Sequence, residues 1–69
     1  MIEYDVYERP NGMLYRVSLD RPLHAQSEVL VRPLNIWVES SYTVGDILAN
    51  PWVCLKARNV VFKDRLCSQ

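Results

Sequence analysis

Two segments in which apolar and polar residues alternate flank the dipeptide Asn11-Gly12 near the start of the chain. Residues 2–6 carry an apolar side chain at every second position, and residues 13–19 repeat the pattern. A period of two is typical of a β-strand with one buried face. Asn-Gly is the strongest short signal for a type I′ turn, because both central residues of that turn need a positive φ. The sequence therefore predicts an antiparallel hairpin over residues 2–19.

A two-residue turn also predicts how the two strands pair. The pairs expected on the inner face are Val6 with Val17 and Tyr4 with Leu19. On the outer face Tyr7 would lie opposite Arg16. A slip of one residue would move every side chain of one strand to the other face of the sheet. We therefore expect Tyr7 and Arg16 to point outward.

Residues 28–39 form a further extended segment, with Pro33 near its centre. The apolar residues change phase there: Val29 and Val31 are at odd positions, and Leu34, Ile36 and Val38 at even ones. Proline cannot donate a ladder hydrogen bond, so it marks a bulge, a bend or an edge position. The pattern predicts one long strand that bends at Pro33, as strands of small barrels do.

Residues 43–49 carry the signals of a short helix. Thr43 suits the N-cap, and Asp46 stands three residues later, as in a capping box. Gly45 weakens the helix, and Asn50-Pro51 ends it after one or two turns.

The segment after Pro51 is ambiguous. Its valines and aromatic residues favour two strands over residues 52–64, with a turn at Arg58-Asn59. A helix that begins at Asn50-Pro51 is the alternative.

The resulting order is β-β-β-α-β-β in a single small domain, residues 1–69, that is mainly β with one short helix. This order predicts a small five-stranded, partly open barrel. An OB-like barrel has its helix between the third and fourth strands. An SH3-like barrel, the nearest competitor, has a short helical turn before its last strand. A helical C-terminal segment would instead give an α+β fold, a three-stranded antiparallel sheet with a C-terminal helix.

The formal net charge of zero conceals an asymmetry. Residues 1–50 hold four Arg against seven acidic residues, a net charge of −3, and residues 51–69 hold four basic residues against one acid, a net charge of +3. Either the basic segment lies beside the acidic hairpin and the two compensate, or it forms a patch for an acidic partner or nucleic acid. The residues of this basic patch are Lys56, Arg58, Lys63 and Arg65.

Catalytic and metal-dependent functions find little support. The single histidine, His24, lies in a polar connector, where we expect it to be solvated, so a metal site would lack a second imidazole. Two glycines are too few for a phosphate-binding loop. We therefore predict neither enzyme activity nor a metal or cofactor. No apolar run reaches the roughly 18 residues of a membrane span, and the acidic N-terminus is unlike a signal peptide. These features predict a cytoplasmic protein without a membrane partner, in which Cys54 is a reduced, buried thiol.

Binding functions fit the sequence better, because Tyr, Trp and Arg dominate interface hot spots. Trp37 alternates out of phase with Ile36 and Val38, so it either covers a second small cluster or meets a partner. The expected partner-binding residues are Tyr7, Arg16, Trp37 and Tyr42. The sequence predicts a small protein-interaction or regulatory accessory protein that docks on another protein, with monomer and homodimer both left open. The alternative is an OB-like module for single-stranded nucleic acid, in which aromatic residues stack on bases and the basic patch follows phosphates.

Overall fold

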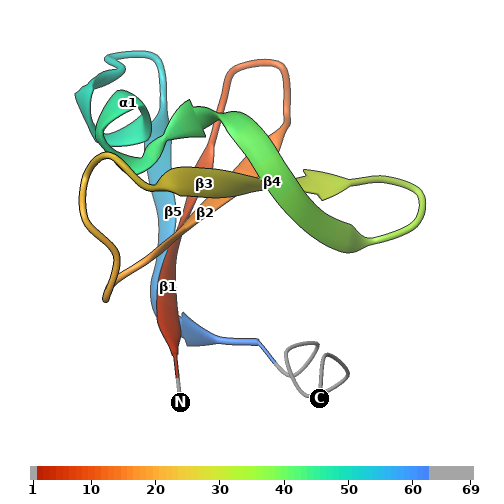
Figure 1. The fold of residues 1–69 in the computed structure, drawn as a ribbon. Helices are drawn as coiled ribbons and strands as arrows, with labels where there is room; N and C mark the ends of the chain where they lie inside the picture. Colours follow the sequence, from red (N-terminus) through yellow and green to blue (C-terminus); the bar gives the residue numbers. More distant parts are fainter. Residues whose placement is uncertain (1, 63–69) are drawn as a thin grey trace.

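The computed structural model describes residues 2–62, which form five strands and one short helix. In chain order these are β1 (Glu3–Glu8), β2 (Leu14–Ser18), β3 (Gln26–Val31), β4 (Ile36–Thr43), α1 (Val44–Ala49) and β5 (Cys54–Val61). The strands make one antiparallel sheet in the order β4-β3-β2-β1-β5 (Figure 1). Within the described residues β4 and β5 are the two edges and do not pair with each other, so the sheet is not closed.

The prediction of a mainly β fold with one short helix is confirmed, but the predicted element order β-β-β-α-β-β is wrong. Four strands precede α1, and one strand follows it. The α+β alternative, a three-stranded sheet with a C-terminal helix, is also wrong, because residues 54–61 form a strand of a five-stranded sheet.

The N-terminal hairpin is present, but its predicted register is wrong by one residue. Val6 lies opposite Arg16, and Tyr7 lies opposite Tyr15. The turn has three residues, not two: Gly12 N donates to Arg9 O at 2.8 Å, and Arg9 N donates to Met13 O at 3.0 Å. Gly12 has a φ of 88°, as the last residue of a type I turn followed by a bulge requires.

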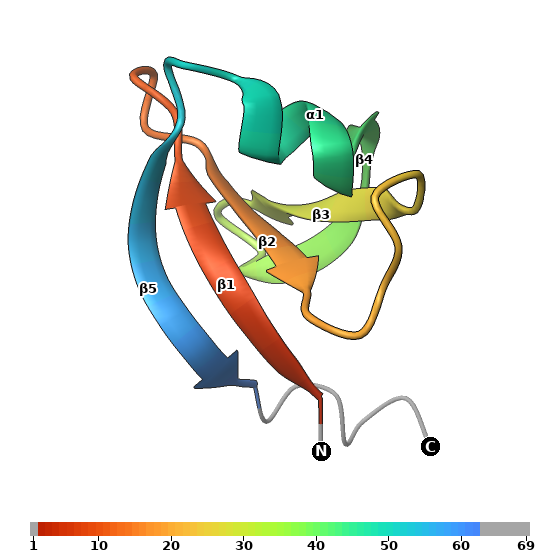
Figure 2. The same cartoon turned by 90° about the vertical axis from the view of Figure 1, so that its left-hand side faces the viewer.

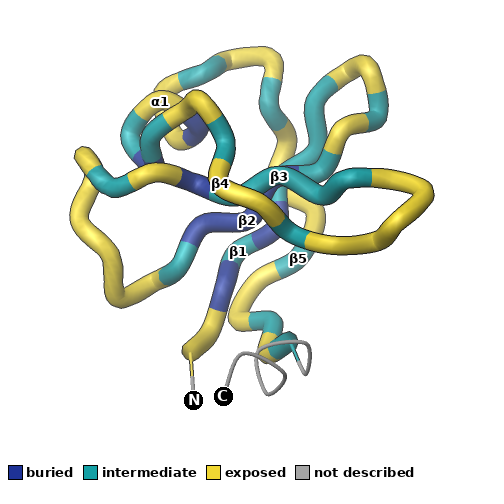
Figure 3. The backbone as a smooth tube through the Cα atoms, turned by 45° about the vertical axis from the view of Figure 1, so that its right-hand side comes forward, coloured by how far each residue is buried: buried dark blue, intermediate teal, exposed yellow. Residues whose placement is uncertain are grey.

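This register gives the central sheet two buried faces. Tyr4, Val6 and Arg16 lie on one face, and Tyr15 and Val17 lie on the other; all five are buried (Figure 3). The expectation that Tyr7 and Arg16 both point outward is therefore wrong. Tyr7 packs against the main core, and the one-residue difference turns Arg16 to the face of Tyr4 and Val6.

Residues 26–43 are a second hairpin rather than one long bent strand. The chain reverses over residues 32–35, where Asn35 N donates to Val31 O at 2.7 Å. Pro33 follows a cis peptide bond, and Asn35 has a φ of 57°, which asparagine tolerates better than most residues. The change of phase at Pro33 therefore marks a reversal of the chain.

The predicted pair of C-terminal strands is a single strand, β5, within the described residues. The turn signal at Arg58-Asn59 belongs to an irregularity in its pairing with β1, and Asn59 has a φ of 54°. Asn59 N donates to Asp5 Oδ1 at 3.1 Å, and its side-chain amide donates to Glu3 Oε1 at 2.8 Å. The pairing shifts register twice, which is typical of β-bulges that bend an edge strand.

The predicted capping box is present at the start of α1, which packs against one face of the sheet (Figure 2). Asp46 N donates to Thr43 Oγ1 at 3.1 Å, and Thr43 N donates to Asp46 Oδ2 at 3.0 Å. The main core forms on this covered face from Tyr15, Val17, Val44 and Ile47, with Tyr7, Ala25, Val29 and Val53 partly buried against it. Gly45 allows the close approach, because its N–H donates to Leu23 O at 2.8 Å and a Cβ there would lie 3.3 Å from the same oxygen.

Candidate binding surface

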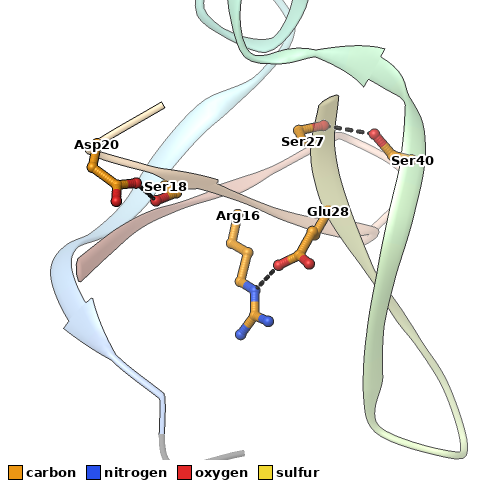
Figure 4. A network of polar contacts seen from close by, with 6 residues as sticks. All are labelled: Arg16, Ser18, Asp20, Ser27, Glu28 and Ser40. Atoms are coloured by element: carbon orange, nitrogen blue, oxygen red, sulfur yellow. Dashed lines mark hydrogen bonds and ion pairs between the residues drawn. The ribbon is translucent and has the colours of Figure 1, made fainter. Parts of the chain in front are cut away.

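Arg16 is the centre of the sheet face opposite α1, which we call the open face. Its position on β2 places it directly across from Glu28 on β3, and Arg16 Nε donates to Glu28 Oε1 at 2.6 Å (Figure 4). Only 1% of the Arg16 side chain is exposed, against 28% of Glu28. A guanidinium buried to this degree needs charge and hydrogen-bond compensation, and Glu28 supplies both.

Three aromatic rings also pack against Arg16. Its Cζ lies 4.3 Å from the ring centroid of Tyr4, 4.6 Å from that of Trp37 and 4.6 Å from that of Phe62. The Phe62 ring also makes edge contacts with Tyr4 and Trp37, with centroids 5.5 and 5.4 Å apart. We call Arg16, Glu28 and the three aromatic residues Tyr4, Trp37 and Phe62 the Arg16 cluster. Since Trp37 belongs to β4 and Phe62 follows β5, the cluster links the two edges of the sheet.

An apolar hollow of about 440 Å³ opens beside the Arg16 cluster on the open face. A second hollow, of about 370 Å³, lies between the β1–β2 turn and the end of β3 and shares Leu14 and Leu30 with the first. We call the two together the apolar trough. The first hollow is lined by Val6, Leu14, Leu30, Asn35, Trp37, Lys56, Ala57, Val60 and Phe62, and the second by Asn11, Gly12, Met13, Leu14, Val29, Leu30, Val31 and Arg32.

A smaller polar pocket of about 110 Å³ also borders Arg16. Its charged lining residues are Arg16, Arg21, Glu28 and Glu39. Among the described residues, the lining of this pocket therefore carries two cations and two carboxylates, with no net formal charge.

The structure brings two of the four predicted partner-binding residues together. Arg16 and Trp37 are in contact, but both are packed in the Arg16 cluster, where Trp37 is partly buried. The interpretation of Trp37 as cover for a second cluster therefore fits its position. Tyr7 and Tyr42 belong to the other side: Tyr7 packs against the main core, and the Tyr42 ring meets Tyr15 edge-on at 5.9 Å.

The environments of these two tyrosines differ in charge. Burial raises the pKa of Tyr7, the Asp5 carboxylate raises it further, and Arg58 partly opposes both. Arg9 lies over Tyr42 at 5.2 Å from the ring centroid, and hydrogen bonds to Tyr15 and Tyr42 raise the pKa of this arginine above its usual value. Arg9 is thus a fixed cation beside the exposed Tyr42.

Of the predicted basic patch, Lys56 and Arg58 lie exposed on β5, whereas Lys63 and Arg65 are outside the described residues. Lys56 Nζ lies 3.6 Å from Glu8 Oε1. Since β5 pairs with the acidic strand β1, these charges lie beside acids, as the compensating interpretation expects.

Sequence reasoning missed several exposed groups. Trp52 is the most exposed large apolar residue described, at 71%, and it follows the Asn50-Pro51 break between α1 and β5. Pro51, which ends the helix, was the available signal that Trp52 lies in an exposed connection. Cys54 was expected to be buried but is exposed, because it begins an edge strand. His24 is exposed in the β2–β3 connector, as predicted.

In the part of the chain that the structure describes, no group of three or more His, Cys, Asp or Glu side chains could hold a metal ion. Among the same residues no helix is long and apolar enough to cross a membrane. No protein-family model, curated protein or solved structure matches this chain.

Proposed function

We propose that this chain is a small, non-catalytic protein-interaction module with an SH3-like arrangement of strands. Strands β1 to β4 follow one another across the sheet, and β5 returns to pair with β1. A short helix directly before the last strand favours the SH3-like order over the OB-like order, in which the helix follows the third strand.

The apolar trough is the observation that supports an interaction function. Its larger hollow lies on the open face between the two edge strands, and the lining of that hollow is mostly Leu, Val and aromatic side chains. The apolar lining of such a hollow stays in contact with water until a partner fills it, so binding of a partner is favourable. Arginine and aromatic residues beside it are the types that carry most energy in protein interfaces.

Binding of single-stranded nucleic acid is the weaker alternative. Exposed Lys56 and Arg58 could follow phosphates, but the neighbouring strand β1 carries Glu3, Asp5 and Glu8 beside β5. These carboxylates reduce the local positive potential on which phosphate binding depends. Trp37 is packed against Arg16 and Phe62, so its ring is less open to a base.

Cross-linking in the source cells tests the proposed function. A tagged chain is cross-linked, and its partners are identified by mass spectrometry with and without nuclease treatment. We expect that a partner protein is captured even after nuclease treatment, and that the substitution Leu30→Ser in the trough abolishes this capture. Leu23→Ser is the matched control, because Leu23 is exposed in the β2–β3 connector and does not line the trough.

The function is refuted if no protein is captured reproducibly, or if every captured protein disappears after nuclease treatment. Circular dichroism of both variants shows whether a lost partner reflects a lost fold. If Leu30→Ser fails to fold, Lys56→Glu at the rim takes its place, since that side chain is 53% exposed and its change leaves the core intact.

A further inference from the structure

We propose that the apolar trough binds an extended acidic segment of a partner protein, in which apolar residues alternate with Asp or Glu. This inference rests on the proposed function and names the chemistry of the partner. It is carried by the charges that line the trough and by the free edge beside it.

Among the described residues, the charged ones that line the trough are Arg32 and Lys56, and both are basic. Arg32 is exposed in the β3–β4 turn, and Lys56 is exposed on β5. Lys56 lies 3.6 Å from Glu8, whose side chain is 41% exposed, so the pair is a weak surface ion pair. A partner carboxylate can therefore replace Glu8 at little cost. An apolar floor with cationic rims complements a segment that has apolar anchors and acidic neighbours.

The edge of β4 provides the backbone partner for such a segment. Within the described residues no strand pairs with the outer side of β4. The only charged residue of β4, Glu39, is acidic, so an apolar position of the segment and not an acidic one would lie opposite it. The other edge, β5, carries Lys56 and Arg58 and two register shifts, features that discourage further strand pairing. An added strand on β4 would point alternate side chains toward the larger hollow of the trough, beside Trp37, and the others away from it.

Two other occupants of the trough, a second copy of this chain and a nucleic acid, fit these charges less well. A second copy of the chain, docked trough to trough, would bring Arg32 and Lys56 of both copies to one interface and repel itself. A nucleic acid would find two cations for its phosphates but few polar groups for its bases among Leu14, Leu30 and Val60.

A displayed library of random peptides, each about ten residues long, tests the proposal with the purified chain. Such a peptide spans about 33 Å when extended, close to the 35 Å longest dimension of the protein. We expect enriched peptides to alternate apolar and acidic residues. The most enriched peptide is then labelled, and its affinity is measured by fluorescence anisotropy at low and moderate salt.

Charge reversal locates the peptide. The double variant Arg32→Glu, Lys56→Glu should weaken binding by about tenfold or more, because two attractive contacts become repulsive. The double variant Arg21→Glu, Arg58→Glu makes the same change in net charge outside the trough, and it should keep the wild-type affinity. Peptide binding should weaken as salt increases.

The proposal is overturned if no peptide is enriched, if the enriched peptides are basic or uncharged, or if both double variants lose affinity equally. It is also overturned if light scattering shows a dimer whose formation blocks the peptide, or if an oligonucleotide of about 20 nucleotides binds in the trough instead. If the cross-linked cell partner survives Arg32→Glu, Lys56→Glu, this inference fails while the proposed function stands. If no partner protein exists in cells, the proposed function itself fails.

Discussion

Replacing Arg16 by methionine tests whether the Arg16 cluster stabilises the fold. Methionine keeps much of the length and packing of the side chain but removes its charge. The variant loses the interaction with three ring faces at 4.3 to 4.6 Å and leaves Glu28 without its 2.6 Å contact. A desolvated cation–π interaction contributes about 2 kcal/mol, and we take that value for the three overlapping contacts together.

The carboxylate of Glu28 adds a smaller penalty. Leaving a buried polar group without its partner costs about 1 to 3 kcal/mol, and we take the lower value because Glu28 is 28% exposed. Arg16→Met should therefore reduce the free energy of unfolding by about 3 kcal/mol. That loss is a large share of the roughly 3 to 10 kcal/mol expected for a chain of this length, and it lowers Tm by roughly 12 to 24 °C.

Urea denaturation followed by tryptophan fluorescence measures the change, because Trp37 lies in the cluster. The double variant Arg16→Met, Glu28→Leu should recover about 1 kcal/mol relative to Arg16→Met, since it removes the unpaired carboxylate. The reasoning is refuted if Arg16→Met changes stability by less than about 0.5 kcal/mol, the range of ordinary surface substitutions. It is also refuted if the effects of the two substitutions simply add.

Three further predictions concern the turn, the helix cap and a buried tyrosine. Gly12→Ala should destabilise the fold by about 1 kcal/mol through backbone strain at a φ of 88°, and Gly12→Asn by less; equal effects in thermal unfolding would contradict the three-residue turn. Thr43→Val should cost about 1 kcal/mol by removing the acceptor for Asp46 N, and an unchanged Tm would show that the cap contributes nothing. Burial raises the pKa of Tyr7 above its usual 10.0, so the folded chain holds this proton more tightly than the unfolded chain. The stability that this tighter proton binding confers is present below pH 10.0 and falls as the pH rises through the folded pKa. In alkaline urea titrations Tyr7→Phe should flatten that decline, and an unchanged slope would contradict the raised pKa of Tyr7.

Local signals predicted the N-terminal hairpin and the capped helix because each depends on neighbours in the chain. Thr43 and Asp46 satisfy each other within one turn, and the alternation around Asn11-Gly12 is a property of the strands themselves. The register failed because both faces of this hairpin are buried, so alternation alone could not select the inner face. Pro10 was the decisive signal: proline suits the second position of a type I turn, which lengthens the loop by one residue.

The binding surface was harder to predict because it depends on contacts distant in sequence. Arg16 was assigned to the outer face by the predicted register, but Tyr4, Glu28 and Trp37 reach it from three other strands. No local pattern contains that information. The same reason explains Arg58-Asn59: a turn signal cannot distinguish a chain reversal from a bulge until the partner strand β1 is known.

The burial of Arg16 on the open face is the central claim, and NMR of its guanidinium tests it most directly. The account predicts a slowly exchanging Arg16 Nε–Hε signal, because this group is buried and donates to Glu28. It also predicts that ring currents of Tyr4, Trp37 and Phe62 shift the Arg16 side-chain protons upfield. If the Arg16 Nε–Hε signal exchanges as fast as that of exposed Arg58, and if the Arg16 side-chain protons keep unperturbed shifts, Arg16 faces solvent. The claim that both faces of the central sheet are buried would then be wrong.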